Sequence, residues 1–456
     1  MVRQSLIFLA LLSLLGCSAK SPQQPVVTEK GPWVLLRQEK LWGDLTASEY
    51  KFPNGLKAVL VPDTQAPVYA FQIWFNVGSR DEKLGKTGIA HLFEHLMFKA
   101  TKNVEDGGFD RLITSLGGDS NAATWLDWTY YREEIPSGTL ETIMKLEADR
   151  MVNLILNKDQ VESERQVVLN ERRFRVDNNP SGLVYETLYK LAFSKHPYGW
   201  PTIGWEPDIK AITIEDTLKF YKTFYAPNNA TIVIVGDFDP NKALTLINKY
   251  FGSLPSQTIA ERNLPVEPPQ ELEKRGTIKQ PVPTEKLVMG WHIPKVADPE
   301  HAAVQVMNLI LFTGKSSRLY QVLVENLQLA TEVGGWVAEF ADPGLLELEV
   351  TLREQHTTGE AEGVIYDEIE RFKREGPSSR EVQKAKNQLE SGYYRSVATV
   401  GGKAEVIGHF QVTVGDFAFT KVQLASIQKV NINDVRRVSK QILTPANRTV
   451  VEVKKK

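Results

Sequence analysis

The chain has 456 residues, of which 42% are hydrophobic and 24% charged, and this is typical of a globular protein with roughly two to four domains. The formal net charge of −2 and the lack of a basic stripe argue against a nucleic-acid partner. The single cysteine excludes an intrachain disulfide and a cysteine-based zinc site.

The N-terminus has the pattern of a lipoprotein signal peptide over residues 1–17. Its apolar run, residues 6–15, is too short to cross a bilayer as a stable helix and ends in Leu-Leu-Gly-Cys. This ending resembles a bacterial lipobox, so we expect cleavage before Cys17 and lipidation of its thiol. An ordinary secretory signal with an incidental cysteine is the alternative.

The residues after the cysteine indicate where such a lipoprotein would reside. The residue after the cysteine is Ser18 and not an aspartate. This resembles Gram-negative lipoproteins that are sorted to the outer membrane. We therefore expect a protein of the bacterial cell envelope that is lipid-anchored to the outer membrane and faces the periplasm. Residues 18–44 are predicted to form a tether and an N-terminal extension.

The next part of the chain mixes strand and helix patterns without a regular βαβ alternation. Apolar alternation and apolar faces at helical spacing predict these elements in order: strands at 55–63 and 68–78, helices at 86–100 and 106–116, one strand at 117–136 after a turn at Gly117-Gly118, and helices at 139–156 and 158–176. This mixture predicts an α+β fold class, in which helices pack on one face of a mostly antiparallel sheet.

The chain contains an internal repeat. Residues 209–238 and 427–456 align without a gap, and each copy has the pattern of a helix, a Pro-Asn turn and an alternating strand. The period is too long for a solenoid, so the repeat predicts a duplication into two homologous tandem domains. We place these domains at 45–253 and 284–456, joined by a linker at 254–283 that is rich in proline and charge.

Three polar residues interrupt an apolar helical run in the first domain. His91 and His95 are four residues apart and therefore share one helical face, with Glu94 beside them. This is the zinc-binding pattern H-x-x-E-H. The alternative is a pair of core histidines bonded to carbonyl groups, with Glu94 in an ion pair.

A catalytic zinc ion usually has three protein ligands, so a third ligand is needed. Glu164 and Glu171 are seven residues apart, which places both on one face of a helix. Either carboxylate is a candidate. The alternative is that both are solvated positions on a charged helix.

The spacing of these residues resembles one known family. His91, Glu94 and His95, followed by Glu171 after the sequence ERQVVLN, are similar to the M16 family of inverzincin metallopeptidases, which also consist of tandem homologous α+β domains. The resemblance implies that His91, His95 and Glu171 bind one Zn²⁺ per chain and that Glu94 is the general base. It also implies that Glu164 orients one of the ligands.

The segment GGDSNAATW resembles the family's substrate-binding edge strand, to which a peptide in extended conformation adds as a further strand. On this resemblance Asn121 and Ala122 contact the substrate backbone. The alternative is a plain half-buried strand.

The second domain departs from the family pattern. It has no H-x-x-E-H, and active members carry an arginine and a tyrosine there, in a pattern like L-R-E-K-x-G-L-A-Y, that stabilise the tetrahedral intermediate. Val324 and Thr331 occupy these two positions here. Some bacterial members split the zinc site and the Arg/Tyr pair between two subunits. We therefore expect a heterodimer with a related subunit that supplies the pair, although a homodimer remains an alternative.

These patterns predict a zinc-dependent endopeptidase that hydrolyses peptides or unfolded protein segments. The alternative is a non-catalytic structural or assembly subunit of the same fold. The intact set of metal and base residues favours the first reading, whereas Val324 and Thr331 favour the second unless a partner completes the site.

Overall fold

The structure is a computed structural model that describes residues 30–456 and contains two β-sheets with helices packed around each of them. The predicted signal peptide of residues 1–17, which includes Cys17, lies outside the described residues. Among residues 30–456, no helix has both the length and the apolar character needed to cross a membrane.

The first sheet has seven strands in the order β1-β2-β3-β7-β4-β6-β5, and the second has five in the order β10-β11-β9-β12-β8. The strands of the first sheet are β1 (Val34–Trp42), β2 (Leu45–Lys51), β3 (Lys57–Pro62), β4 (Val68–Phe75), β5 (Asp119–Thr124), β6 (Thr129–Pro136) and β7 (Ala230–Gly236). Those of the second are β8 (Lys274–Gln280), β9 (Lys286–Ile293), β10 (Ala330–Val337), β11 (Gly344–Leu352) and β12 (Arg448–Lys455).

The helices surround these sheets. They are α1 (Ile89–Leu96), α2 (Gly108–Ser115), α3 (Leu140–Asn153), α4 (Lys158–Arg172), α5 (Pro180–Ala192), α6 (Glu206–Ala211), α7 (Ile214–Phe224), α8 (Pro240–Phe251), α9 (His301–Leu311), α10 (Arg318–Tyr320), α11 (Thr358–Glu375), α12 (Ser379–Ser396), α13 (Val400–Thr413), α14 (Phe419–Lys429) and α15 (Ile432–Ile442). Five short segments complete the structure: η1 (Ser79–Asp81), η2 (Arg173–Asp177), η3 (Pro197–Gly199), η4 (Pro227–Asn229) and η5 (Gln321–Asn326).

The two sheets share one topology. The order β3-β7-β4-β6-β5 corresponds to β8-β12-β9-β11-β10, and the equivalent pairs β3–β7 and β8–β12 are both parallel. The repeated sequence segments form equivalent elements, namely α7 with β7 and α15 with β12. Both helices begin with a capping box, from Thr213 and Asp216 in α7 and from Asn431 and Asp434 in α15. The predicted α+β class with two homologous tandem domains is therefore confirmed.

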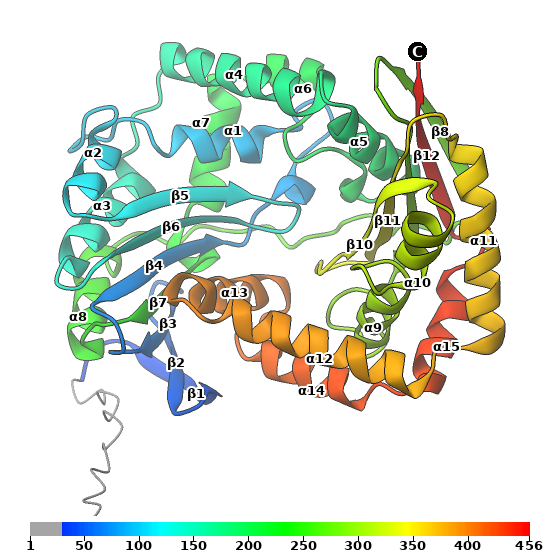
Figure 1. Ribbon diagram of the computed structural model, residues 1–456. Coiled ribbons are helices and arrows are strands. Elements are labelled where there is room, and N and C mark those ends of the chain that lie inside the picture. Colours follow the sequence, from blue (N-terminus) through cyan, green and yellow to red (C-terminus); the bar gives the residue numbers. More distant parts are fainter. Residues whose placement is uncertain (1–29) are drawn as a thin grey trace, which may run out of the picture.

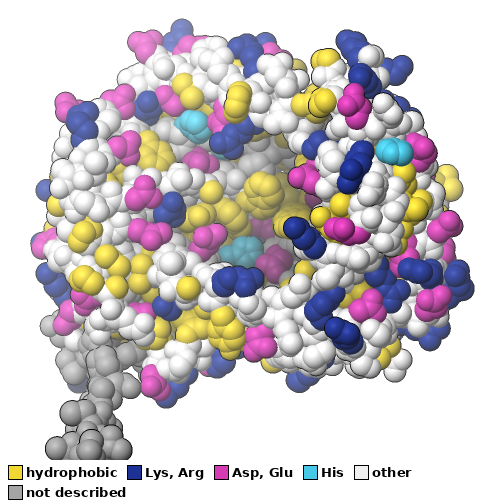
Figure 2. Space-filling model, viewed as in Figure 1, with side chains coloured by type: hydrophobic (Ala, Val, Ile, Leu, Met, Phe, Trp, Pro, Cys, Tyr) yellow, Lys and Arg dark blue, Asp and Glu magenta, His cyan; other side chains and the backbone are white. Residues whose placement is uncertain are grey.

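The two domains lie side by side, and α12, α13 and α14 run from the second domain to the first (Figure 1). The space-filling view from the same side shows a hollow between the domains (Figure 2). The edge strand β5 and helix α1 belong to one wall, and the edge strand β10 belongs to the other. Two free strand edges therefore border the same space.

Two helices cover the sheet of the opposite domain, so helices lie on both faces of each sheet. α13 packs on β4 and β7, and α5 packs on β8, β9 and β12. In β4, Tyr69 and Phe71 face the helices of their own domain, whereas Ala70 and Trp74 face α13. Gly408 permits this close approach, because a Cβ atom there would overlap the indole of Trp74.

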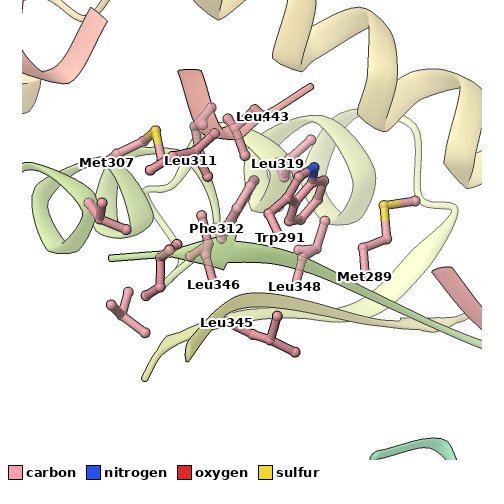
Figure 3. Close-up of a cluster of buried hydrophobic side chains, with 14 of the residues drawn as sticks. Met289, Trp291, Met307, Leu311, Phe312, Leu319, Leu345, Leu346, Leu348 and Leu443 are labelled. Carbon is pink, nitrogen blue, oxygen red and sulfur yellow. The ribbon is translucent and has the colours of Figure 1, made fainter. Parts of the chain in front are cut away.

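The second domain has its own apolar core on the face of the sheet away from α5. Trp291 of β9 stacks on Phe312, with ring centroids 5.9 Å apart, and Met289, Leu346 and Leu348 lie around them (Figure 3). Burial of such large side chains contributes about 1.5–3 kcal/mol each. This core fixes β10 and β11 opposite the first domain.

The predicted extension and linker both contain strands. β1 lies within the predicted extension of residues 18–44. It pairs with β2, and Arg37 of this strand forms an ion pair with Asp416 at 2.7 Å. β8 lies within the predicted linker of residues 254–283, and its residues pair with β12 in the second sheet. The second sheet therefore begins at Lys274.

The segment 117–136 is a hairpin and not one strand. It forms β5 and β6, and its turn is at 125–128, where the amide of Trp125 donates to the carbonyl of Trp128. The prediction placed the turn at Gly117-Gly118, because glycine pairs are strong turn signals. Gly117 does have a φ of 78°, but it precedes the first strand of the hairpin.

Candidate metal centre

Helix α1 carries the H-x-x-E-H motif and is fixed at its first turn. Gly88 precedes the helix with a φ of 89°, and a Cβ atom there would lie 2.5 Å from the carbonyl oxygen of Ile203. The carboxylate of Glu82 accepts hydrogen bonds from the amides of Gly88 and Ala90, at 2.9 and 2.8 Å. A carboxylate at a helix N-terminus is favourable for the helix dipole, so this contact anchors the helix that presents the motif.

Three predicted ligands converge. Glu171 Oε2 lies 3.3 Å from His95 Nε2 and 3.7 Å from His91 Nε2, and one donor atom of each residue lies within 4.8 Å of the others. Zinc bonds of about 2.0–2.1 Å at a tetrahedral angle separate two donor atoms by about 3.3 Å. The donor set therefore fits a zinc ion, and the two histidines are not simply core residues bonded to carbonyls.

Glu164 lies behind this group. Its Oε2 is 3.6 Å from His95 Nδ1, the ring nitrogen that faces away from Glu171. A carboxylate on the second nitrogen of a histidine ligand fixes the ring and its tautomer. The geometry thus separates the two acidic residues of α4: Glu171 faces both Nε2 atoms and Glu164 faces only the far side of one ring.

The electrostatics of the group favour a cation. Burial lowers the pKa of His91 to about 4, and the neighbouring His95 adds to this effect. Burial also lowers the pKa of His95, but the hydrogen bonds with Glu164 and Glu171 outweigh it and raise the value to about 9. His91 is therefore neutral at pH 7, the form in which a histidine binds a metal, and the two carboxylates stabilise a positive charge at His95.

Glu94 belongs to α1 and lies next to Thr124, the last residue of the edge strand β5. Burial raises the pKa of Glu94 above its ordinary value, against the lowering effect of the hydrogen bonds from Thr124. Its Oε2 atom is buried and has no hydrogen-bond partner within residues 30–456. A buried carboxyl group with one free oxygen is suited to accept a proton.

Asn121 and Ala122 lie on β5, which forms the edge of the seven-stranded sheet as predicted. The side chain of Asn121 is exposed, and its oxygen accepts a hydrogen bond from the amide of Ala122 at 2.9 Å. The other edge of β5 pairs with β6. The strand therefore has a free side on which a peptide can pair.

A cavity of about 510 Å³ adjoins His91 and Glu171. Both domains line it, and its aromatic residues are Trp125, Tyr185, Tyr189, Tyr198, Trp200 and Trp336. The phenol groups of Tyr185, Tyr189 and Tyr198 donate to the carboxylates of Glu349, Glu347 and Asp127, and Glu347 itself lines the cavity together with Arg175 and Glu186. Figure 2 shows the hollow between the domains with apolar side chains on its walls.

The two departures from the family pattern lie in the second domain. Val324 is buried in η5, whereas Thr331 is exposed on β10 and donates to the carbonyl of Thr351. Gln328, which occupies the glycine position of that pattern, has a φ of 54°. This left-handed conformation is one that glycine adopts most easily, so it supports the alignment that places Val324 and Thr331 at the Arg and Tyr positions.

Sequence reasoning missed several residues near the group. Thr124 gives no signal beyond its place in a strand, and the aromatic residues of the cavity come from distant segments such as α5 and β10. Lys99 contacts Glu164 at 2.7 Å, and its spacing of four residues from His95 was a usable signal.

Comparison with known proteins agrees with this arrangement. Residues 57–206 match the family described as Insulinase (Peptidase family M16), and residues 211–389 match the Peptidase M16 inactive domain. The chain is 31% identical to the zinc protease PqqE of Helicobacter pylori, over 88% of this chain and 91% of that protein. It is 25% identical to an uncharacterized zinc protease of Streptomyces coelicolor, over 87% of each.

Solved structures show the same fold. A protease from Helicobacter pylori superposes with a TM-score of 0.85 at 29% identity, over 92% of this chain and 100% of that chain. The periplasmic protease PqqL from Escherichia coli has a TM-score of 0.75 at 19% identity, over 92% of this chain and 48% of that chain. The two family matches and the relative above 30% identity lead to one conclusion: the chain belongs to peptidase family M16.

Proposed function

We propose that this protein is a zinc-dependent endopeptidase that hydrolyses peptides or unfolded protein segments. It binds one Zn²⁺ through His91, His95 and Glu171. The observation that carries the proposal is the convergence of three donor atoms within 4.8 Å, beside the buried carboxyl group of Glu94. A purely structural role needs none of these four side chains in this arrangement.

The chemistry follows from the chain's own groups. A zinc ion in such a site makes a bound water acidic and polarises a carbonyl group. Glu94 takes the proton of the attacking water and returns it to the leaving amine, and its raised pKa suits both transfers. Thr124 holds the carboxyl group during the reaction.

The substrate is an extended peptide. It adds to the free side of β5, where Asn121 and Ala122 contact its backbone. Strand pairing brings the peptide past Thr124 and Glu94, and one side chain next to the scissile bond then reaches the aromatic cavity. The six aromatic residues among those that line this cavity support a large apolar side chain at that position.

The site is completed by a related subunit that supplies an arginine and a tyrosine. Val324 cannot donate a hydrogen bond, and the hydroxyl of Thr331 is bonded to the carbonyl of Thr351 at 3.2 Å. Loss of one preorganised oxyanion donor costs about 10²- to 10³-fold in rate. The chain alone should therefore be a poor peptidase, and its partner should close over the face that holds the metal centre.

The same observation favours a second candidate function. Without a complementing partner, Val324 and Thr331 would leave a non-catalytic structural or assembly subunit of the M16 fold.

One experiment tests both candidates. The purified protein is analysed for zinc and incubated with a mixture of unstructured peptides, alone and after co-expression with a related M16 chain that carries the Arg/Tyr pair. Glu94→Gln is the control for contaminating peptidases. Zinc with hydrolysis only in the complex supports the split site. Zinc without hydrolysis in either sample supports the structural subunit, and absence of zinc contradicts the metal centre.

The proposed location is the outer membrane, where a lipid on Cys17 anchors the protein on the periplasmic side. The motif Leu-Leu-Gly-Cys supports this proposal. Cys17→Ser should abolish lipidation and release the protein from the membrane fraction. Membrane association that survives this change with normal cleavage would contradict the anchor.

A further inference from the structure

The two carboxylates of α4 divide their oxygen atoms in the same way. Glu171 directs Oε2 to the histidines and Oε1 to Arg175, whose Nε lies 2.9 Å away. Glu164 directs Oε2 to His95 and Oε1 to Lys99, whose Nζ lies 2.7 Å away. Glu171 therefore lies between the two histidines and Arg175, and Glu164 lies between His95 and Lys99.

Lys99 compensates a buried charge. Glu164 is 6% exposed, and an ionised carboxylate at this depth needs a partner of opposite charge. His95 is neutral when it is a metal ligand, so it no longer provides that charge. Lys99 then faces Glu164 as the cation that holds Oε1 and keeps Oε2 aimed at the imidazole.

Arg175 has a different environment. It follows Glu171 by four residues in the π-helical segment η2, and its side chain is 70% exposed where it borders the cavity. Oε1 of Glu171 is bonded to Arg175, and Oε2 is the oxygen that faces the histidines. The arginine thus favours a one-oxygen contact over a two-oxygen contact.

We propose that Lys99 and Arg175 are positioning residues of the metal centre. Arg175 holds the outer oxygen of Glu171 so that one oxygen faces both histidines, and Lys99 holds the outer oxygen of Glu164 so that one oxygen faces His95. The proposal rests on the proposed zinc site. Neither cation touches the metal, and each acts through the carboxylate that it holds.

The two residues should differ in their effect. Lys99→Met should accelerate loss of zinc by about 10- to 100-fold, the range seen when the partners of metal ligands are removed. Arg175→Gln should accelerate it by about 5-fold at most, because exposed ion pairs are weak. Lys99→Arg keeps the charge and should restore most of the retention.

Zinc dissociation from the holo protein into an excess of chelator measures these rates. Two exposed neighbours provide matched controls: Lys102→Met, and Arg173→Gln, whose side chain donates only to Asn170 within the described chain. Both controls should match the wild type. The absorption spectrum of the cobalt-substituted protein is the second measurement, since a two-oxygen contact raises the coordination number and weakens the visible bands. That weakening is expected for Arg175→Gln and not for Arg173→Gln.

The outcomes separate this inference from the proposed function. Unfolding of the metal-free variants shows whether Lys99 only supports the fold, in which case Lys99→Met would melt earlier and bind zinc normally once folded. Dissociation rates and cobalt spectra equal to those of the controls would overturn the inference and leave the zinc site intact. A wild-type protein that holds no zinc would instead overturn the proposed function.

Discussion

Thr124, the last residue of β5, hydrogen-bonds the carboxyl group of Glu94 through both its backbone and its side chain. The strand on which a peptide would pair therefore ends at the proposed general base. We therefore expect the position of a peptide on β5 and the position of the Glu94 carboxyl group to be coupled through Thr124.

Replacement of Thr124 tests this coupling. Thr124→Val removes the side-chain hydrogen bond and keeps the shape, so kcat should fall about 10-fold or more, since bonds to charged groups contribute about 1.5–3 kcal/mol. Zinc content should not change, because Glu94 is not a ligand. Thr124→Ser keeps the hydroxyl and is the control. An unchanged kcat in Thr124→Val would show that the backbone bond alone holds the base.

The roles within the H-x-x-E-H motif make a second prediction. His91→Ala and His95→Ala should each lose bound zinc, because two ligands rarely hold the ion in a catalytic site. Glu94→Gln should retain zinc and lose turnover. Elemental analysis of the three purified variants measures this directly. Equal zinc occupancy in all three would refute the assignment.

The two acidic residues of α4 make a third prediction. Glu171→Gln should weaken zinc affinity strongly, because Glu171 Oε2 faces both histidines. Glu164→Gln should weaken it less, by about 10- to 100-fold. Competition with a chelator of known affinity ranks the two variants. The reverse order would mean that the two roles are exchanged.

Stability should depend on pH through Glu347, which is 5% exposed and accepts the hydroxyl of Tyr189 at 2.6 Å. Burial raises the pKa of Glu347 from an ordinary 4.5 to about 7, against the lowering effect of the Tyr189 bond. The folded protein therefore binds this proton more tightly than the unfolded chain. Its contribution to stability is present below pH 4.5 and is lost as the pH rises to about 7.

In Glu347→Gln this position has no carboxyl group that can ionise. Between pH 4.5 and 8 the free energy of unfolding of the wild type should therefore fall by up to about 3 kcal/mol more than that of the variant. Urea unfolding at the two pH values gives the difference. Glu332→Gln, at an exposed position of the neighbouring strand β10, is the control and should follow the wild type. Parallel losses in wild type and Glu347→Gln would contradict a buried, protonated Glu347.

The sequence predicted the parts of the structure that depend on local patterns. The repeat anticipated two sheets of one topology, and helical periodicity anticipated that His91 and His95 share one face, as do Glu164 and Glu171. The choice of Glu171 as the residue that meets both histidines came from the resemblance to family M16. β1 and β8 were missed since their exposed, charged residues resemble linker, and only pairing with β2 and β12 makes them strands.

The remaining features depend on contacts between distant segments. An apolar helix face shows that a helix is covered, but not which sheet covers it, so the placement of α5 and α13 could not be derived. The same holds for the cavity wall at Trp336 and Tyr189, which belong to different domains. Thr124 meets Glu94 only because β5 runs past α1.

Helix α5 of the first domain covers the second sheet, and α13 of the second domain covers the first sheet. This arrangement has a consequence for how the chain could be divided. Each half leaves one face of its sheet bare when the other half is absent, and the bare face is apolar. Two fragments made by a cut between residues 254 and 273 should therefore stay associated and complement one another. Expressed as separate genes, neither half should be soluble alone, even though each is a copy of the same ancestral unit.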